Sequence, residues 1–360
     1  MIKILHSADW HMDATLRAFT PEQRIALRRE MLALPGKIAD ICIREDCDLV
    51  LLSGDLFDGF SYTPESVSAV RNALLRMEVP VFIAPGNHDY CRGGSPWMQE
   101  DWPVNVFIFD KPQITSYRLP ELSCRVYGAG FDSIDCPGLL NGFQADAEER
   151  YAVMVLHGDP TAADSPYCPV TAAQVRDSGL DYLALGHIHA AGRFGAGGGL
   201  CAWPGCPMGK GYDETGIKGV LVVELERDRE TVLQFVPVDG TRFYDWNTEA
   251  GENPVRALER ALPAEGSEDF YRIHLTGESQ GIDLEALRKH FSRFPNLTLL
   301  DETVPVTPLW ERAGEDSLEG VCFRLLQDAM ATANREQREE LELAARLCRS
   351  ILQGQEVTLP

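Results

Sequence analysis

The sequence predicts an α/β fold, in which a layered β-sheet core flanked by helices is followed by a small α+β domain and a C-terminal helical hairpin. Over residues 1 to about 240, short continuous apolar runs alternate with helix-like segments, and such runs are expected for strands buried on both faces. Further along the chain, a short α+β pattern is followed by two amphipathic stripes. We therefore expect three domains, at 1–240, 245–304 and 310–355.

The first domain contains five candidate strands, at 2–5, 49–53, 80–84, 151–156 and 182–185. A helix is expected at 22–44 with an interruption near Pro35, because proline removes a helix hydrogen bond. A second helix is predicted to begin at Thr63, which precedes a proline. Beyond residue 200, strands and turns take over, and 219–225 and 232–238 are predicted to pair.

The second domain is expected to contain a strand at 270–275, a helix at 283–294 and a strand at 297–301. Pro305 and Pro308 then indicate a linker. In the tail, Asp316 is a candidate cap for one helix, Asn334 with Gln337 repeats a capping pattern for a second, and Gly354 ends it. The apolar stripes of these helices either pack on their own domain or dock a partner helix.

The charge balance of the chain argues against an extended basic surface. The net charge is −22, and both parts of the chain are acidic. From Asp245 onward there are 12 Lys/Arg and 22 Asp/Glu residues, and before Asp245 there are 21 Lys/Arg and 33 Asp/Glu residues. Phosphate backbones favour basic surfaces, so either the substrate is small, or DNA is held by metals, a local basic patch or a partner subunit.

No apolar run approaches the roughly 20 residues of a membrane helix, so no membrane association is expected. The ten cysteines form no C-x-x-C pair, which is typical of structural thiols in a reducing compartment. A cleaved signal peptide would remove Asp9 and His11, which belong to the first motif described below. We therefore expect a cytoplasmic protein.

Polar side chains follow each strand-like run directly. The segments are Asp9-Trp10-His11, Gly54-Asp55, Gly86-Asn87-His88-Asp89, His157-Gly158-Asp159 and Gly186-His187-Ile188-His189, and they hold five of the eight histidines. Each segment alone could be a polar turn, a helix cap or a satisfied core histidine. Together they offer only oxygen and imidazole nitrogen from several strand ends, which suits a pair of divalent metal ions.

Individual residues of these segments suggest distinct roles. Asp55 has two oxygens and could bridge two cations, and Gly54 allows the tight turn that aims it. Asn87 would fill a coordination position without adding charge. His88 could donate a proton to a leaving oxygen, and Asp89 could hold the other ring nitrogen of His88.

Three further imidazoles come from His157, His187 and His189. The single residue between His187 and His189 sends their rings to different sides, which suits ligation of two metals rather than one. The pattern therefore predicts a dinuclear metal centre and hydrolysis of phosphate esters.

The order of these motifs resembles the calcineurin-like metallophosphoesterase superfamily. Residues 5–13 (LHSADWHMD), 53–58 (SGDLFD) and 203–208 (WPGCPM) are similar, in particular, to the DNA-repair exonucleases related to the nuclease subunit of the SbcCD complex. The resemblance implies a metallophosphoesterase-type layered core. The motifs span residues 5 to about 225, and the later domains match only in layout.

The resemblance also implies a ligand set. One metal would take Asp9, His11, Asp55 and His189, and the other would take Asp55, Asn87, His157 and His187. Two divalent ions, with Mn2+ as the expected species, would clamp the attacking and leaving oxygens while His88 protonates the departing oxygen. Asp58 stands where some relatives carry a histidine that assists exonuclease action, so that assistance is not expected of it.

The function implied is that of a DNA exonuclease in DNA repair, with endonuclease activity left open, acting with a coiled-coil SMC-like ATPase. Residues 245–300 would be a capping domain, and 315–353 would grip the ATPase; a homodimer is a further possibility. One alternative is a phosphoesterase for small phosphodiesters or phosphoproteins, which the acidity favours. A second is a non-catalytic tether for DNA ends.

Overall fold

The computed structural model describes residues 1–360 except 147, 196–198, 227–228, 307–308 and 353–360. The chain divides into two compact units, one formed by Met1–Asp245 with Glu268–Arg272, the other by Trp246–Ser267 with Ile273–Pro360. Across the described segments, no helix combines the length and apolar character needed to span a bilayer.

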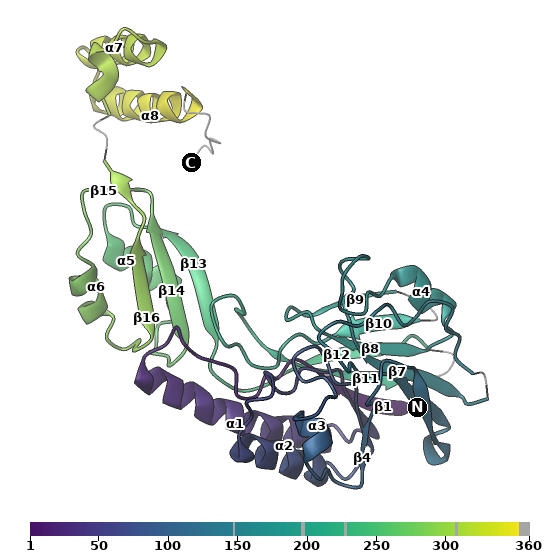
Figure 1. The fold of residues 1–360 in the computed structure, drawn as a ribbon. Helices are drawn as coiled ribbons and strands as arrows, with labels where there is room; N and C mark the ends of the chain where they lie inside the picture. The colour runs from purple at the N-terminus through teal and green to yellow at the C-terminus, as the bar shows by residue number, and fades with distance from the viewer. Residues whose placement is uncertain (147, 196–198, 227–228, 307–308, 353–360) are drawn as a thin grey trace. The chain divides into compact units, whose positions relative to one another are not determined.

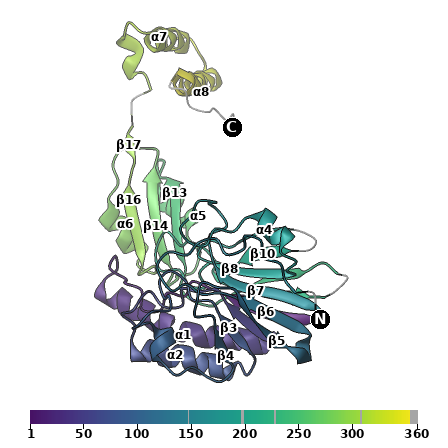
Figure 2. The same cartoon turned by 45° about the vertical axis from the view of Figure 1, so that its right-hand side comes forward.

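The first unit contains two six-stranded sheets (Figures 1 and 2). The first has the order β12-β11-β1-β2-β3-β4 and consists of β1 (Ile2–Ser7), β2 (Leu49–Leu52), β3 (Val81–Ile83), β4 (Val106–Ile108), β11 (Gly219–Leu225) and β12 (Val232–Pro237). Strands β1 to β4 are parallel, and the predicted pair β11–β12 is confirmed as antiparallel. The carboxyl ends of β1, β2 and β3 therefore lie along one edge.

The second sheet has the order β5-β6-β7-β8-β10-β9. Its strands are β5 (Thr115–Leu119), β6 (Cys124–Gly128), β7 (Tyr151–His157), β8 (Tyr182–Gly186), β9 (Gly192–Phe194) and β10 (Leu200–Trp203). The central strands β6, β7, β8 and β10 run parallel, whereas β5 and β9 are antiparallel edges. All five strands predicted for the first domain are thus present, each within two residues of its expected ends.

Apolar side chains fill the space between the two sheets. One buried cluster combines Ile4, Leu51 and Phe82 of the first sheet with Val153 and Ala184 of the second. The alternate residues of the same strands point outward, toward helices on one side and toward a separate cluster on the other. The unit is therefore a layered α/β/β/α structure. It agrees with the predicted layered sheet core flanked by helices, because strands buried on both faces need helices outside.

Helices α1 (Pro21–Arg44) and α2 (Pro64–Arg76) cover the outer face of the first sheet and lie side by side (Figure 1). Thr63 caps α2, as predicted, with its side chain accepting from the Ser66 N–H. The expected interruption of α1 near Pro35 is wrong. The helix continues through this proline because both flanking turns bury an apolar face, including Met31 and Ile38, and tertiary packing outweighs a local cost of about 3 kcal/mol.

Short elements complete the unit. They are α3 (Pro96–Gln99), the 3-10 turn η1 (Pro120–Leu122) and α4 (Ala172–Asp177), with Thr171 and Gln174 forming a capping box at the start of α4. Helix α4 lies over the cluster on the outer face of the second sheet, to which Val175 contributes.

The α+β pattern after residue 243 forms a three-stranded sheet, β13 (Phe243–Glu249), β14 (Phe270–Thr276) and β16 (Leu297–Asp301), in that order. Helices α5 (Pro254–Ala261) and α6 (Leu284–His290) and the small β15–β17 pair (Glu278–Ser279, Val304–Pro305) accompany it. Asp283 caps α6, but the helix is shorter than expected. It ends at His290 because Phe291 and Phe294 turn inward to be buried ahead of Pro295.

The tail forms a 3-10 turn, η2 (Glu311–Gly314), and the expected pair of helices, α7 (Leu318–Met330) and α8 (Arg335–Leu352). The cap of α7 is Ser317 rather than Asp316, since its hydroxyl accepts from the Gly320 N–H at 3.1 Å. Asn334 and Gln337 exchange the two predicted bonds. Pro308 and Gly354, expected in the linker and at the end of α8, lie outside the described residues.

Candidate metal centre

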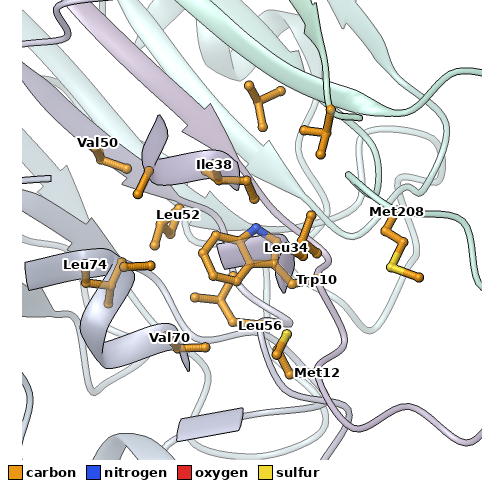
Figure 3. Packing of buried hydrophobic residues seen from close by; sticks show 14 of the residues in the cluster. Trp10, Met12, Leu34, Ile38, Val50, Leu52, Leu56, Val70, Leu74 and Met208 are labelled. Carbon is orange, nitrogen blue, oxygen red and sulfur yellow. The ribbon is translucent and has the colours of Figure 1, made fainter. Parts of the chain in front are cut away.

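Trp10 anchors the first motif in the hydrophobic core. Trp10 stands between Asp9 and His11 in the sequence, and its ring is fully buried. Figure 3 shows the ring among Leu34, Leu52 and other apolar side chains of the cluster beneath α1 and α2. The indole N–H donates to the Ser7 hydroxyl at 2.8 Å. The loop after β1 thus buries Trp10 in the core and places Asp9 and His11 at the carboxyl end of β1.

The loops after β1 and β2 are bonded to each other. The Asp9 N–H donates to the Gly54 carbonyl at 3.0 Å, and the His11 N–H donates to the Asp55 carbonyl at 2.9 Å. Asp9, His11 and Asp55 all have positive φ, between 48° and 56°, a conformation that costs free energy for residues other than glycine. Positive φ at three predicted ligands indicates that these loops are held in shape for their side chains.

Two glycines allow the loops to approach the buried ligands closely. A Cβ at Gly86 would lie 2.3 Å from Oδ1 of Asp55, and a Cβ at Gly54, where φ is +82°, would lie 2.7 Å from Nδ1 of His157. Any side chain at these positions would displace a predicted ligand.

The structure brings all seven predicted metal ligands together. On one side, Nε2 of His11 lies 3.1 Å from Nε2 of His189, and these residues form with Asp9 a group whose donor atoms all lie within 4.8 Å of one another. Asp55 lies within reach of this side, with Oδ2 3.8 Å from Nε2 of His11.

The remaining ligands meet on the other side of Asp55. Oδ1 of Asn87 lies 2.9 Å from Nε2 of His157 and 3.2 Å from Nδ1 of His187. The same Oδ2 of Asp55 lies 3.4 Å from Nε2 of His157. Asp55 therefore stands between two ligand sets, and His187 and His189 contribute to different sets.

The residues fit a pair of cations. Oδ2 of Asp9 is buried without a hydrogen-bond partner, which is costly unless another group satisfies it. The donors are carboxylate, amide and imidazole groups, the set that suits divalent ions such as Mn2+ or Zn2+. The sequence prediction of a dinuclear site thus agrees with the chemistry and spacing of these side chains.

Burial shifts the pKa values of several predicted ligands. For the histidines, the shift favours the neutral form, which is the form that binds a metal ion. Burial lowers the pKa of His11 to about 4 and that of His157 well below its usual value, so each imidazole is neutral and keeps a lone pair. Burial raises the pKa of Asp9 to about 6, and a cation bound nearby would favour its charged form.

Each of three ligand imidazoles has its other ring nitrogen fixed by a distinct partner. Nδ1 of His157 faces the Ser53 carbonyl at 2.8 Å, and Nδ1 of His11 faces Oδ1 of Asp58 at 2.9 Å. Nδ1 of His189 faces Oε1 of Glu214 at 2.5 Å. Such partners fix the tautomer and the orientation of a metal-binding histidine.

Glu214 is a residue that the sequence analysis missed. It is buried, and its second oxygen accepts from the Lys210 N–H at 2.7 Å and lies 3.3 Å from the Lys210 ammonium. Although burial opposes it, the hydrogen bond from His189 lowers the pKa of Glu214 to about 2. In the sequence, Glu214 follows the motif at 203–208 by only six residues, but this position does not indicate that its carboxylate contacts His189.

The side chain of His88 is exposed beside the ligands, and its partner differs from the predicted one. Its Nδ1 lies 3.3 Å from Oδ1 of Asp58, and this contact raises the pKa of His88. The expectation that Asp89 holds this nitrogen is wrong. The Asp89 carboxylate is fully buried and accepts four backbone N–H groups, those of Asp55, Leu56, Phe57 and Gly86.

Curated proteins that are similar to this chain include a metallophosphoesterase, a nuclease subunit and a DNA repair protein. A curated relative is the uncharacterized metallophosphoesterase YhaO of Bacillus subtilis, 26% identical over 88% of this chain and 82% of its own. A component of the SbcCD nuclease of Bacillus subtilis is 23% identical over 71% of this chain and 74% of its own. The DNA double-strand break repair protein Mre11 of Saccharolobus solfataricus is 25% identical, over 63% and 61%.

The family model of the calcineurin-like phosphoesterases matches residues 2–191, more than half of the chain. This stretch includes β1, β2, β3, β7 and β8, whose carboxyl ends carry all seven predicted ligands. With the layered fold and the paired ligand sets described above, this match shows that the chain belongs to the calcineurin-like phosphoesterase family.

Proposed function

We propose that this metallophosphoesterase is a phosphodiesterase with two divalent ions, most simply Mn2+, that acts as a DNA exonuclease in DNA repair and works with a coiled-coil SMC-like ATPase. The observation that carries the proposal is the convergence of six predicted ligands, three on each side of Asp55, next to the exposed side chain of His88. The names of two relatives, a DNA repair protein and a nuclease component, favour DNA as the substrate.

The residues divide into two proposed ligand sets. Asp9, His11 and His189 would hold one ion, and Asn87, His157 and His187 would hold the other, with Asp55 shared. When bound, such ions stabilise the charge that develops on the phosphate oxygens. Glu214, Asp58 and the Ser53 carbonyl keep three of the imidazoles in the tautomers that point their free nitrogens inward.

His88 is proposed to donate the proton to the departing sugar oxygen. Its backbone N–H donates to Oδ1 of Asp55 at 2.9 Å, which fixes the ring close to the shared ligand, and its side chain is 43% exposed and open to substrate. The Asp58 carboxylate favours the protonated ring, which is the form that a general acid needs.

The tail supports docking of a partner helix. Phe323 and Ala345 are buried in the hairpin, whereas Leu318 and Leu325, which belong to the predicted apolar stripe of α7, are 69% and 66% exposed. The hairpin therefore leaves much of this stripe exposed, which favours the docking alternative over simple packing. We propose a coiled-coil segment of the ATPase as the occupant.

The test of the proposed reaction uses the purified full chain, linear DNA labelled at either end, and Mn2+. Degradation from the ends is expected, and His88→Ala should abolish it while metal binding is retained. Turnover of small phosphodiesters without DNA degradation would instead support the small-substrate alternative. DNA-end binding without hydrolysis of any substrate would support the tether alternative.

The partner is tested separately. A search of the neighbouring open reading frames for a long coiled-coil ATPase comes first, and pull-down of such an ATPase is then compared with and without residues 315–353. A matched pair of substitutions sharpens the test: Leu318→Glu and Leu325→Glu on the exposed stripe, against Arg335→Glu and Glu339→Arg, an exposed ion pair at the start of α8. Loss of capture by the first pair alone is expected. Equal capture by all variants would refute docking on this stripe.

A further inference from the structure

Three partly exposed aromatic side chains lie beside the metal centre and are not used by the proposed chemistry. Phe60 is 39% exposed, and its ring packs edge-on against Tyr90 with a centroid distance of 4.9 Å. Tyr167 lies over a ligand, with its ring 4.8 Å from that of His187. We call these three residues, Phe60, Tyr90 and Tyr167, the aromatic rim.

The aromatic rim adjoins both sides of the candidate metal centre, through the chain on one side and through a ring contact on the other. Phe60 comes two residues after Asp58, and Tyr90 two residues after His88, so this pair belongs to the loops that carry the proposed acid and its partner. Tyr167 contacts the second ligand set through His187. Substrate bound at the centre therefore has aromatic faces near both the His88 side and the His187 side.

A common support holds the two tyrosines. Both pack against the buried cluster of Phe131, Cys136 and Cys168, and Phe131 also contacts the ring of His157 with a centroid distance of 5.5 Å. The Cys91 N–H donates to the Phe131 carbonyl at 2.7 Å, which fixes the loop after His88 to the same support. The rim is thus a preorganised surface.

The acidity of the chain is a reason to expect that the aromatic rim contributes to DNA binding. A net charge of −22 disfavours binding through phosphate contacts, and the Lys210 ammonium close to the centre is already paired with Glu214. Stacking of bases on aromatic rings depends far less on protein charge and contributes about 1–3 kcal/mol per base. An acidic nuclease can gain much of its substrate affinity in this way.

We propose that the aromatic rim is a base-stacking subsite, which selects single-stranded DNA ends whose unpaired bases flank the scissile phosphate. This inference rests on the proposed nuclease function and adds to it the form of the substrate. Bases held in a duplex are stacked on each other and are not free to stack on Phe60 or Tyr167, so paired ends must fray before they are bound.

The test compares single-stranded oligonucleotides that differ only in their bases. One carries bases throughout; the other carries abasic residues next to the cleaved bond, with the same phosphates and charge. Binding is measured by fluorescence anisotropy in Ca2+, and kcat and KM are measured in Mn2+. Wild-type protein should bind the base-bearing strand about 5- to 150-fold more tightly, which is the affinity ratio for 1–3 kcal/mol.

Variants then assign this preference to the rim. Phe60→Ala and Tyr167→Ala should raise Kd and KM for the base-bearing strand at both low and high salt, with little change for the abasic strand or in kcat. Phe60→Trp should restore tight binding. Phe235→Ala is the matched control, because Phe235 is also 39% exposed but lies on the edge strand β12, so it should behave as wild type.

Two outcomes overturn the inference. Equal weakening of base-bearing and abasic strands would show that the rim residues act structurally, and unchanged binding in both alanine variants would show that no base stacks there. If the wild-type protein hydrolyses small diesters but binds and cleaves no DNA at all, the proposed nuclease function fails as well.

Discussion

Replacing Glu214 by glutamine tests whether a residue outside the ligand set controls metal binding. The carboxylate is 6% exposed and holds Nδ1 of His189 at 2.5 Å, so glutamine keeps an acceptor at this nitrogen but removes the charge. Loss of such an outer partner typically weakens metal affinity 10- to 100-fold, or by about 1.4–2.7 kcal/mol. Because the acceptor survives, we expect a tenfold loss for Glu214→Gln and the larger loss for Glu214→Ala.

The assay is a titration of metal-free protein with Mn2+, followed by calorimetry and by the electron paramagnetic resonance signal of free Mn2+, without substrate. One of the two binding steps should weaken, since Glu214 contacts His189 but none of the ligands in the Asn87 set. Glu319→Gln is the matched control: Glu319 is 8% exposed and lies in the second compact unit. Unchanged Mn2+ affinity in both Glu214 variants, or equal weakening of both steps, would refute the reasoning.

Three further substitutions give distinct expected results. Trp10→Ala removes the buried ring that anchors Asp9 and His11, so the free energy of unfolding in urea should fall by about 3–5 kcal/mol; a loss below 1 kcal/mol would contradict the anchoring role. Burial lowers the pKa of His6 to about 3, so below pH 6.5 the unfolded chain takes up a proton there that the folded chain does not. Between pH 7 and pH 5, the free energy of unfolding of the metal-free wild type should therefore fall by about 2 kcal/mol more than that of His6→Gln. If the two free energies change with pH in parallel, this reasoning is refuted. Asp58→Asn removes the carboxylate that raises the pKa of His88, so kcat should fall and the alkaline limb of its pH profile should move to lower pH; an unshifted limb would show that His88 is not the acid.

The strands and the polar residues that meet at their carboxyl ends could be predicted from the sequence because both signals are local. Each apolar run is followed at once by its polar residue, and carboxyl ends of adjacent parallel strands meet at one edge of a sheet. The division of the strands between two sheets could not be predicted, since an apolar run such as that of β7 does not indicate which strand it pairs with. Pro35 shows the same limit, because tertiary packing kept α1 intact there.

The partners of the ligands were harder to predict than the ligands. Asp89 adjoins His88 in the sequence, yet the carboxylate next to the His88 ring comes from Asp58, thirty residues earlier. Glu214 reaches His189 from twenty-five residues away, through a loop without a recognisable pattern. Side-chain contacts of this kind depend on how loops cross in space, which sequence spacing does not determine.

The four backbone bonds to Asp89 have a consequence for how the centre responds to damage. The Asp89 carboxylate ties the loop after β2 to the loop after β3. These loops carry Asp55, Asn87 and His88, which are the proposed shared ligand, neutral ligand and acid. The positions of these three residues therefore depend on one buried carboxylate. Asp89→Ala would remove all four bonds and loosen the three residues together, so Asp89 is expected to support the proposed site through the backbone of both loops.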